Sequence, residues 1–276
     1  MLNVLPPPAD LRPWVHGAVV LHSPPHLSST CFPAQAHSMW VIRLSGSVFV
    51  KCQTPEPMDL PLPAAALIPP STRFTVYAHE GGIHAIGLVL HPAALPCLIQ
   101  GSAAGWADRH LSLSDLPGMR LPPLLDALHG AADDQTRMHI LWDGMRRLVR
   151  HPHHEVRRQR LQHLGDAISG DLSQAARTLG ISTRQLQRQC MAGFGLTPKQ
   201  YQTLVRLQST LRSAWRRPAP SLCNGADLAL AQGFFDQSHL ARDMRRLVGT
   251  SMGTLLQQAG KPDSLHWPLD AGTRFS

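Results

Sequence analysis

The stretch that most constrains the fold of this chain covers residues 227–249, DLALAQGFFDQSHLARDMRRLVG. A short apolar run ends at Gly233, and Asp236 and Ser238 then offer side-chain oxygens that can cap a second helix. Within that helix apolar residues recur every four positions and share one face, while arginines fall on the other sides. The apolar positions are Leu240, Met244 and Val248. Two short helices joined at a glycine, the second of them basic, predict a helix-turn-helix.

The same pattern occurs once more upstream, in residues 172–195, LSQAARTLGISTRQLQRQCMAGFG. The two copies align on their turn glycines, Gly180 and Gly233. A long helix is expected between them, over about residues 199–216, and Pro218 and Pro220 end it. A duplicated unit bridged by one long helix is much more specific than a single unit, and it predicts an all-helical second half.

The charge of the chain is confined to that second half. Residues 1–150 carry 10 Lys and Arg against 10 Asp and Glu, whereas residues 151–260 carry 14 against 6. The whole excess of +8 therefore lies with the duplicated unit, as a surface that meets phosphates requires. An anionic membrane surface or simple solubility would explain a basic patch equally well, so the charge supports nucleic-acid binding only together with the motif.

The first half has a different character, because it holds 18 of the 24 prolines. Prolines disfavour long helices and suit short strands and turns. The expected strands are residues 17–21, 39–50, 64–68, 74–77 and 83–90, and helices are expected over residues 93–100, 121–129 and 137–150. These elements predict a small antiparallel barrel or sandwich followed by helices.

The predicted fold class is therefore α+β, with two domains. A small β-barrel-like domain with following helices comes first, and an all-α domain with two helix-turn-helix units joined by a long helix comes second. The expected boundaries are residues 1–152, residues 153–262 and a tail of residues 263–276, because His151 and Pro152 interrupt the helical pattern.

Five widely spaced cysteines without a C-x-x-C pair favour reduced thiols over a disulfide framework or a zinc site. The N-terminus has no basic segment followed by an apolar one, so no secretory signal is predicted. No apolar run approaches the length of a membrane span. We expect a cytoplasmic protein that does not associate with a membrane.

At these motifs the sequence resembles the AraC/XylS family of transcriptional regulators, over about residues 161–259. Residues 229–242, ALAQGFFDQSHLAR, resemble the family signature IA-x-x-x-GF-x-D-x-S-x-F-x-R. Residues 195–201, GLTPKQY, resemble the element that follows the first unit in this family, and Arg206 and Leu207 resemble a pair in its linker helix. The resemblance implies a sensor or oligomerisation domain in front. Residues 91–116 resemble the barrel-type first domain of one branch of the family.

Some positions depart from the family pattern. Leu240 and Met244 stand where the family usually has phenylalanine, and Cys190 replaces a similar aromatic in the first unit. Thr210 takes the place of the usual linker alanine, and Ser251 with Met252 replaces a second Thr-Pro. These substitutions affect the last helix and the stability of the domain more than DNA binding.

The resemblance implies that the second helix of each unit enters a major groove, with the two insertions roughly 34 Å apart on one face of the DNA. Arginine suits guanine and glutamine suits adenine in that groove. Some of these arginines can instead contact phosphate or pair internally, and serine is better suited to capping and phosphate contact. The candidate DNA-binding residues are Thr183, Arg184, Gln187, Arg188, Gln237, Ser238, His239, Arg242 and Arg245.

The partners implied are double-stranded DNA and RNA polymerase, with a small-molecule effector and a homodimer as further partners that the sequence leaves open. We considered a metal site at His79, His84 and His91, but the paired H-x-H of cupin sites is absent, and ordinary histidines are expected. We therefore predict no metal and no cofactor. Trp14, Trp40 and Trp106 can line a pocket or pack the core.

No enzyme is predicted. Residues 249–253 satisfy G-x-S-x-G, but that motif needs a strand before Ser251, and a basic helix precedes it here. The alternative function is a cupin-like metal-binding or small-molecule-binding enzyme with an accessory helical domain. The duplicated unit and the confined charge favour the DNA-binding regulator.

Overall fold

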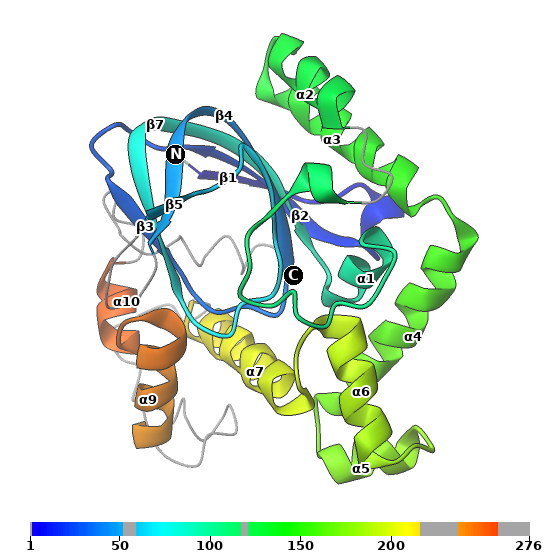
Figure 1. The fold of residues 1–276 in the computed structure, drawn as a ribbon. Coiled ribbons are helices and arrows are strands. Elements are labelled where there is room, and N and C mark those ends of the chain that lie inside the picture. The colour runs from blue at the N-terminus through cyan, green and yellow to red at the C-terminus, as the bar shows by residue number, and fades with distance from the viewer. Residues whose placement is uncertain (1, 52–58, 117–120, 216–236, 259–276) are drawn as a thin grey trace.

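The computed structural model describes residues 2–51, 59–116, 121–215 and 237–258, and it divides into a β-rich part and a helical part (Figure 1). The strands are β1 (Leu2–Leu5), β2 (Val15–His22), β3 (Ser29–Phe32), β4 (Ser38–Lys51), β5 (Asp59–Pro61), β6 (Ala65–Ile68), β7 (Thr75–Leu90) and β8 (Leu111–Ser112). The helices are α1 (Leu95–Leu98), α2 (Leu121–Gly130), α3 (Asp134–Val149), α4 (Pro152–Ile168), α5 (Leu172–Thr178), α6 (Thr183–Phe194), α7 (Pro198–Trp215), α9 (Gln237–Val248) and α10 (Met252–Gln258). Three single 3-10 turns cover Ala9–Leu11, Pro92–Ala94 and Leu113–Asp115. The predicted α+β fold class is confirmed.

The strands form one antiparallel sheet in the order β1-β2-β7-β4-β6-β8, with β3 added to β7 and β5 added to β4. The sheet curves strongly, so that β3 and β5 close over one of its faces (Figure 1). Strand β2 is buried on both sides: Ala18 and Val20 contact the core under the helices, whereas Val19 belongs to the core on the other face. Two apolar cores therefore share the sheet.

Strand β7 corrects the sequence prediction, because residues 74–77 and 83–90 belong to one continuous strand. Gly81 and Gly82 lie between the two predicted strands. They sit where β7 and β4 bend together: Gly81 has a φ of +77° and the facing Gly46 a φ of +78°, and the register of β4 shifts beside Ser45. Glycine inside a strand commonly marks such a bend at a barrel corner.

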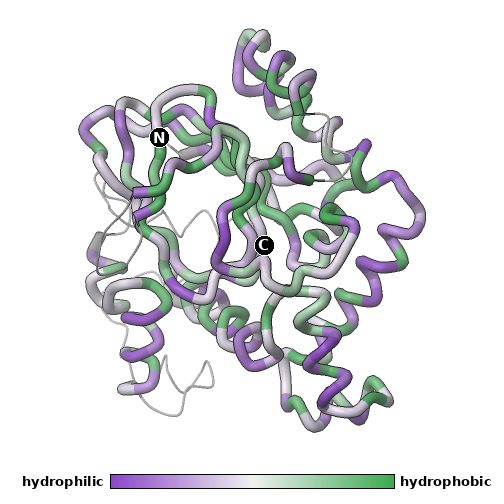
Figure 2. The backbone as a smooth tube through the Cα atoms, viewed as in Figure 1, coloured by the Kyte–Doolittle hydropathy of each residue, from purple (hydrophilic) through white to green (hydrophobic). Residues whose placement is uncertain are grey.

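Helices α2 and α3 cover one end of the barrel, and α4 runs down its side towards the remaining helices (Figure 1). The buried face of α3 carries Met138, Leu141, Trp142 and Met145, which join the core under the sheet. Apolar residues gather in the strands and on the inward sides of the helices, while the outer sides of α4, α6 and α9 are hydrophilic (Figure 2). None of the described helices is both long enough and apolar enough to cross a membrane.

The helical part has a core of its own. Its buried residues come from α4, α5, α6, α7, α9 and α10, and Ala34 and Ala36 of the segment between β3 and β4 join them. Phe194 and Tyr201 stack with ring centroids 4.6 Å apart at the junction of α6 and α7. The helical part therefore packs as one body that includes a piece of the barrel.

Candidate nucleic-acid interface and barrel pocket

Helices α5 and α6 form the first of the two units, and local capping explains their limits. Asp171 caps α5 by accepting a hydrogen bond from the backbone N–H of Gln174 at 2.8 Å. Gly180, with a φ of +64°, makes the turn. Ser182 and Gln185 then form a reciprocal capping box that starts α6.

Helix α6 separates a buried face from an exposed one, as the sequence predicts. Leu186, Cys190 and Phe194 are buried in the helical core. The four candidate residues on the other side are all exposed, and their side chains form no hydrogen bond or ion pair with the described part of the chain; they are Thr183, Arg184, Gln187 and Arg188. A basic helix face that makes no internal polar contact is available to an outside ligand.

Helix α9 has the same division. Leu240, Met244 and Val248 are at most 3% exposed, which confirms the face predicted from their spacing. Its candidate residues Ser238, Arg242 and Arg245 are exposed and His239 is half-buried, while Gln237 begins the helix. The helix predicted before it, with the turn at Gly233, lies outside the described residues.

The candidate residues of α9 are less free than those of α6. The Arg242 Nε donates to the Ser238 carbonyl of its own helix at 3.4 Å. Asp243 accepts from Arg246 at 3.2 Å and lies 3.6 Å from His239 Nε2. Helix α6 therefore has more candidate side chains without an internal polar contact than α9 has.

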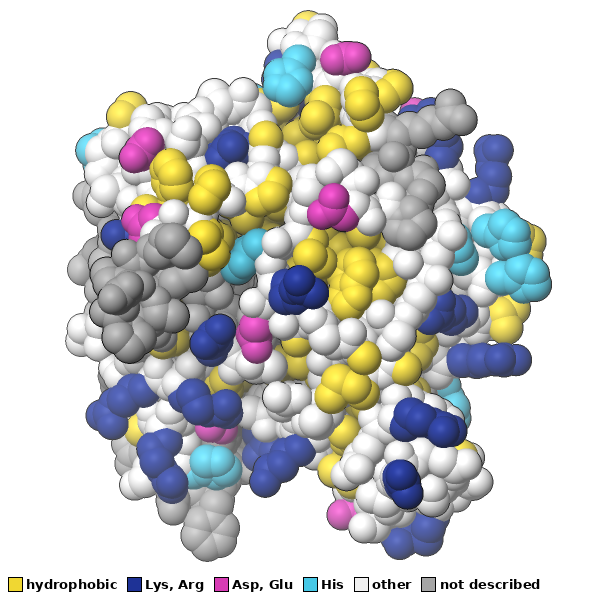
Figure 3. All heavy atoms as spheres, viewed as in Figure 1, with side chains coloured by type: hydrophobic (Ala, Val, Ile, Leu, Met, Phe, Trp, Pro, Cys, Tyr) yellow, Lys and Arg dark blue, Asp and Glu magenta, His cyan; other side chains and the backbone are white. Residues whose placement is uncertain are grey.

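Helices α6 and α9 lie at opposite ends of α7 on one side of the molecule (Figure 1). Lys and Arg side chains gather on that side, in one group over α9 and in another over α5 and α6 (Figure 3). Thr210, at the position where the resemblance has alanine, is fully buried in α7 and donates its hydroxyl hydrogen to the Arg206 carbonyl at 2.8 Å. The buried hydroxyl of Thr210 therefore has a hydrogen-bond partner within its own helix.

Hydrogen bonds connect the β-rich part of the protein to the C-terminal ends of the second helices of both units. The Ala103 N–H donates to the Ala192 carbonyl of α6 at 2.8 Å. The Ala34 N–H donates to the Leu247 carbonyl of α9 at 2.7 Å, and the Cys31 thiol contacts the Val248 carbonyl at 3.6 Å. The N-terminal turns of α6 and α9, which hold most candidate residues, point away from these attachments.

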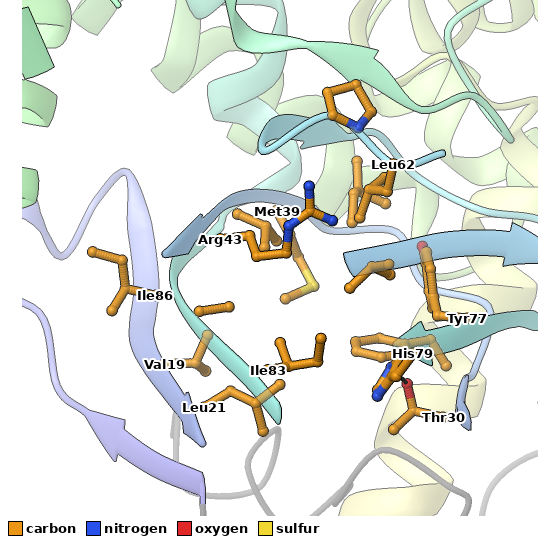
Figure 4. A pocket seen from close by; sticks show the side chains of 16 residues that line it. Val19, Leu21, Thr30, Met39, Arg43, Leu62, Tyr77, His79, Ile83 and Ile86 are labelled. Carbon is orange, nitrogen blue, oxygen red and sulfur yellow. Dashed lines mark hydrogen bonds between the residues drawn. The ribbon is translucent and has the colours of Figure 1, made fainter. Parts of the chain in front are cut away.

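The closed face of the sheet encloses a pocket between β2, β3, β4, β6 and β7 (Figure 4). The empty space among its lining side chains is about 640 Å³, part of which is open to solvent. The lining is almost wholly apolar, with Val19, Met39, Ile68 and Ile83 among its members. An almost wholly apolar lining with a few polar groups is typical of small-molecule sites.

Few polar groups reach this pocket. Arg43 enters it from β4, and burial lowers the pKa of its guanidinium. Among the described residues Arg43 has no ion-pair partner. On another side the imidazole of His79 is hydrogen-bonded to Thr30 at 3.0 Å, and burial lowers the pKa of His79 (Figure 4). The pocket therefore offers one cation and a large apolar wall.

The three histidines considered for a metal do not come together. His79 contacts Thr30, whereas His91 packs on His16 with ring centroids 3.5 Å apart. His84 lies beside Asp134 at 2.9 Å. Trp14 and Trp40 pack in the core under the helices and do not line the pocket.

Ser251 does not sit on a strand-to-helix elbow. It follows the end of α9 at Gly249, and its hydroxyl accepts a hydrogen bond from the backbone N–H of Thr254 at 3.1 Å. The G-x-S-x-G pattern is therefore the cap of α10.

One comparison with known proteins matches the helical part. Residues 175–258 match the family model described as a helix-turn-helix domain. Among solved structures, the chain is similar to ToxT from Vibrio cholerae O395, with 8% identity, a TM-score of 0.46, and coverage of 87% of this chain and 96% of that chain. It is also similar to the unsaturated fatty acid bound wild-type ToxT from Vibrio cholerae strain SCE256, with 10% identity, a TM-score of 0.47, and coverage of 87% and 94%. No curated protein matches the sequence.

Proposed function

We propose that this protein is a sequence-specific DNA-binding transcription regulator, because residues 175–258 match a helix-turn-helix family model and the motifs within them resemble the AraC/XylS family. Helices α6 and α9 enter successive major-groove segments of one DNA duplex, and α7 sets their separation. Residues 153–262 form the DNA-binding domain, residues 1–152 form a sensor domain, and residues 263–276 form a tail. The observation that carries the proposal is the exposed basic face of α6 on such a domain.

The residues divide by role. Arg184 and Gln187 read bases, because both are exposed on α6 and neither has a polar partner among the described residues. Arg188, Arg242 and Arg245 contact phosphate or bases at the edges of the same surface. Thr183, Ser238, His239 and Gln237 lie in the first turns of the two helices, where backbone N–H groups favour a phosphate.

The test is a gel-shift assay with the upstream region of the gene, titrated with salt against competitor DNA. Specific binding that weakens steeply with salt is expected. Arg184→Ala and Gln187→Ala are expected to cost about 1–3 kcal/mol on the preferred site and less on random DNA. Arg160→Ala, which removes an exposed arginine from α4, is the matched control and should leave the preference unchanged. Binding without preference over competitor, together with a flat salt response, would refute the proposal.

The barrel pocket binds the effector in this proposal. Its apolar wall and the cation of Arg43 suit a small amphipathic molecule with one anionic group. Strand β3 connects this pocket to α9, because Thr30 and Phe32 face the pocket while Cys31, between them, contacts the last turn of α9. A ligand that moves β3 therefore moves the attachment of the second unit.

A thermal-shift screen of amphipathic acids and their uncharged amides would test this part. Acids are expected to raise the unfolding midpoint more than their amides, and Arg43→Met should remove that difference. Equal shifts for acid and amide would contradict the role of Arg43 without affecting the DNA-binding proposal. RNA polymerase and a second copy of the chain stay predictions of the sequence.

A further inference from the structure

A second polar cluster lies outside the pocket and the basic surface. His22 of β2 and His84 of β7 are directly opposite one another in the antiparallel pairing of these strands. Their rings stack with centroids 4.1 Å apart and an interplanar angle of 22°. Asp134, the first residue of α3, brings a carboxylate to both: its two oxygens lie 2.8 Å from His22 Nε2 and 2.9 Å from His84 Nε2.

These distances fit a shared ligand set. One ligand atom from each of His22, His84 and Asp134 lies within 4.8 Å of the other two. Around a tetrahedral ion with bonds of about 2.0–2.1 Å, ligand atoms are roughly 3.3 Å apart. The nitrogen-to-oxygen separations need to lengthen by less than about 1 Å to reach that geometry. Neutral imidazoles can supply Nε2 lone pairs by carrying their protons on Nδ1.

The carboxylate is held in place by a further residue. Arg137 donates to Asp134 Oδ1 at 2.8 Å, and its other nitrogens donate to the carbonyls of Leu128 and Ala131 at 3.0 and 2.8 Å. Second partners of this kind orient metal-binding side chains in proteins. The side chains of His22 and His84 are 48% and 20% exposed, so water can reach the cluster and occupy a remaining coordination position.

We propose that His22, His84 and Asp134 bind one divalent transition-metal ion of the class of Zn²⁺. Two imidazoles and one carboxylate suit Zn²⁺ and similar ions, whereas Mg²⁺ and Ca²⁺ prefer oxygen ligands only. The ion links β2 and β7 to the start of α3 and thereby fastens the α2–α3 pair to the barrel. Without the ion, the same three residues form a hydrogen-bonded contact.

The experiment is calorimetric titration of the full-length, chelator-treated protein with Zn²⁺, and with Mg²⁺ as the comparison ion. We expect one Zn²⁺ per chain at this cluster and no heat from Mg²⁺. Asp134→Asn and His22→Gln should each weaken that binding at least tenfold. Both substitutions keep a hydrogen-bonding group, and circular dichroism would verify that the variants fold.

A competing zinc site must be separated from this one. His151 lies just before α4, and His153 lies in its first turn. Both histidines are exposed, and their rings stack with centroids 5.0 Å apart. The matched control is therefore His153→Gln, which should leave the affinity at the proposed site unchanged. Co²⁺ loading should give a visible absorption band that Asp134→Asn removes. Zinc binding that is lost in His153→Gln but retained in Asp134→Asn, or no zinc binding at all, would overturn the proposal.

Discussion

Acidification should destabilise this protein through three buried histidines. His16, His37 and His91 pack together where the barrel meets α7, with ring centroids 4.2 Å apart for His16 and His37. Burial lowers the pKa of all three, to about 3 for His37 and about 4 for His91. The charges of Arg212 on α7 and Arg158 on α4 act in the same direction. All three histidines are therefore neutral in the folded protein at pH 5.5.

At pH 5.5 these three histidines bind protons in the unfolded chain but stay neutral in the folded protein. An unfolded histidine has a pKa of about 6.5, so the folded pKa is depressed and stability falls as pH drops below that value. Between pH 7 and pH 5.5 each such histidine costs about 1.3 kcal/mol, and three together cost about 4 kcal/mol. Because a domain is typically stable by only about 5–15 kcal/mol, the effect is large.

Urea denaturation at pH 7 and pH 5.5, followed by circular dichroism, would measure the change in the free energy of unfolding. His91→Gln keeps a donor for the Arg12 carbonyl, which lies 3.1 Å from His91 Nε2, and should reduce the pH dependence by about 1.3 kcal/mol. The control His163→Gln removes an exposed histidine of α4 and should leave it unchanged. A wild-type loss below about 1 kcal/mol, or equal pH dependence in His91→Gln, would refute the reasoning.

Three further predictions concern the helical part. Gly195→Ala should destabilise the folded protein more than Gly180→Ala does. Both glycines have a positive φ, which costs another residue about 1–2 kcal/mol. Only at Gly195 would the new Cβ meet a backbone atom, because the Ala103 carbonyl oxygen lies 2.6 Å from its position. Equal urea midpoints would contradict this. Ser182→Ala should lower the free energy of unfolding by about 1 kcal/mol through loss of the capping box, with no effect expected on the barrel pocket. Burial raises the pKa of the Cys190 thiol to about 12, so alkylation at pH 8, followed by mass spectrometry, should require denaturant.

The helical part could be predicted from the sequence because its signals are local. The glycines at Gly180, Gly195 and Gly249 all have positive φ, as their places at helix ends imply. The four-residue spacing identified the buried side of α9, and the alignment of the two copies on their turn glycines located α5 and α6. Each of these features depends on residues within one or two turns.

The barrel was harder to predict because its structure depends on distant pairings. Strand β3, Ser29–Phe32, is not among the predicted strands, and it pairs with residues 75–78 of β7, which are distant in the sequence. The cluster of His22, His84 and Asp134 joins residues 112 positions apart, and no spacing in the sequence indicates it. Ala34 contacts α9 through a backbone hydrogen bond, and such a bond does not require a particular side chain, so the sequence does not indicate it.

The arrangement of these contacts bears on how the proposed sensor could control DNA binding. The barrel holds α6 through Ala103 and α9 through Ala34 and Cys31, in each case near the C-terminal end of the helix. The opposite ends, which would meet DNA, keep their polar groups exposed. Separation of the two recognition helices therefore depends on α7 and on two attachments to the same barrel. Since β3 forms a wall of the pocket as well as the attachment of α9, the proposed effector would alter that separation without touching either proposed recognition surface.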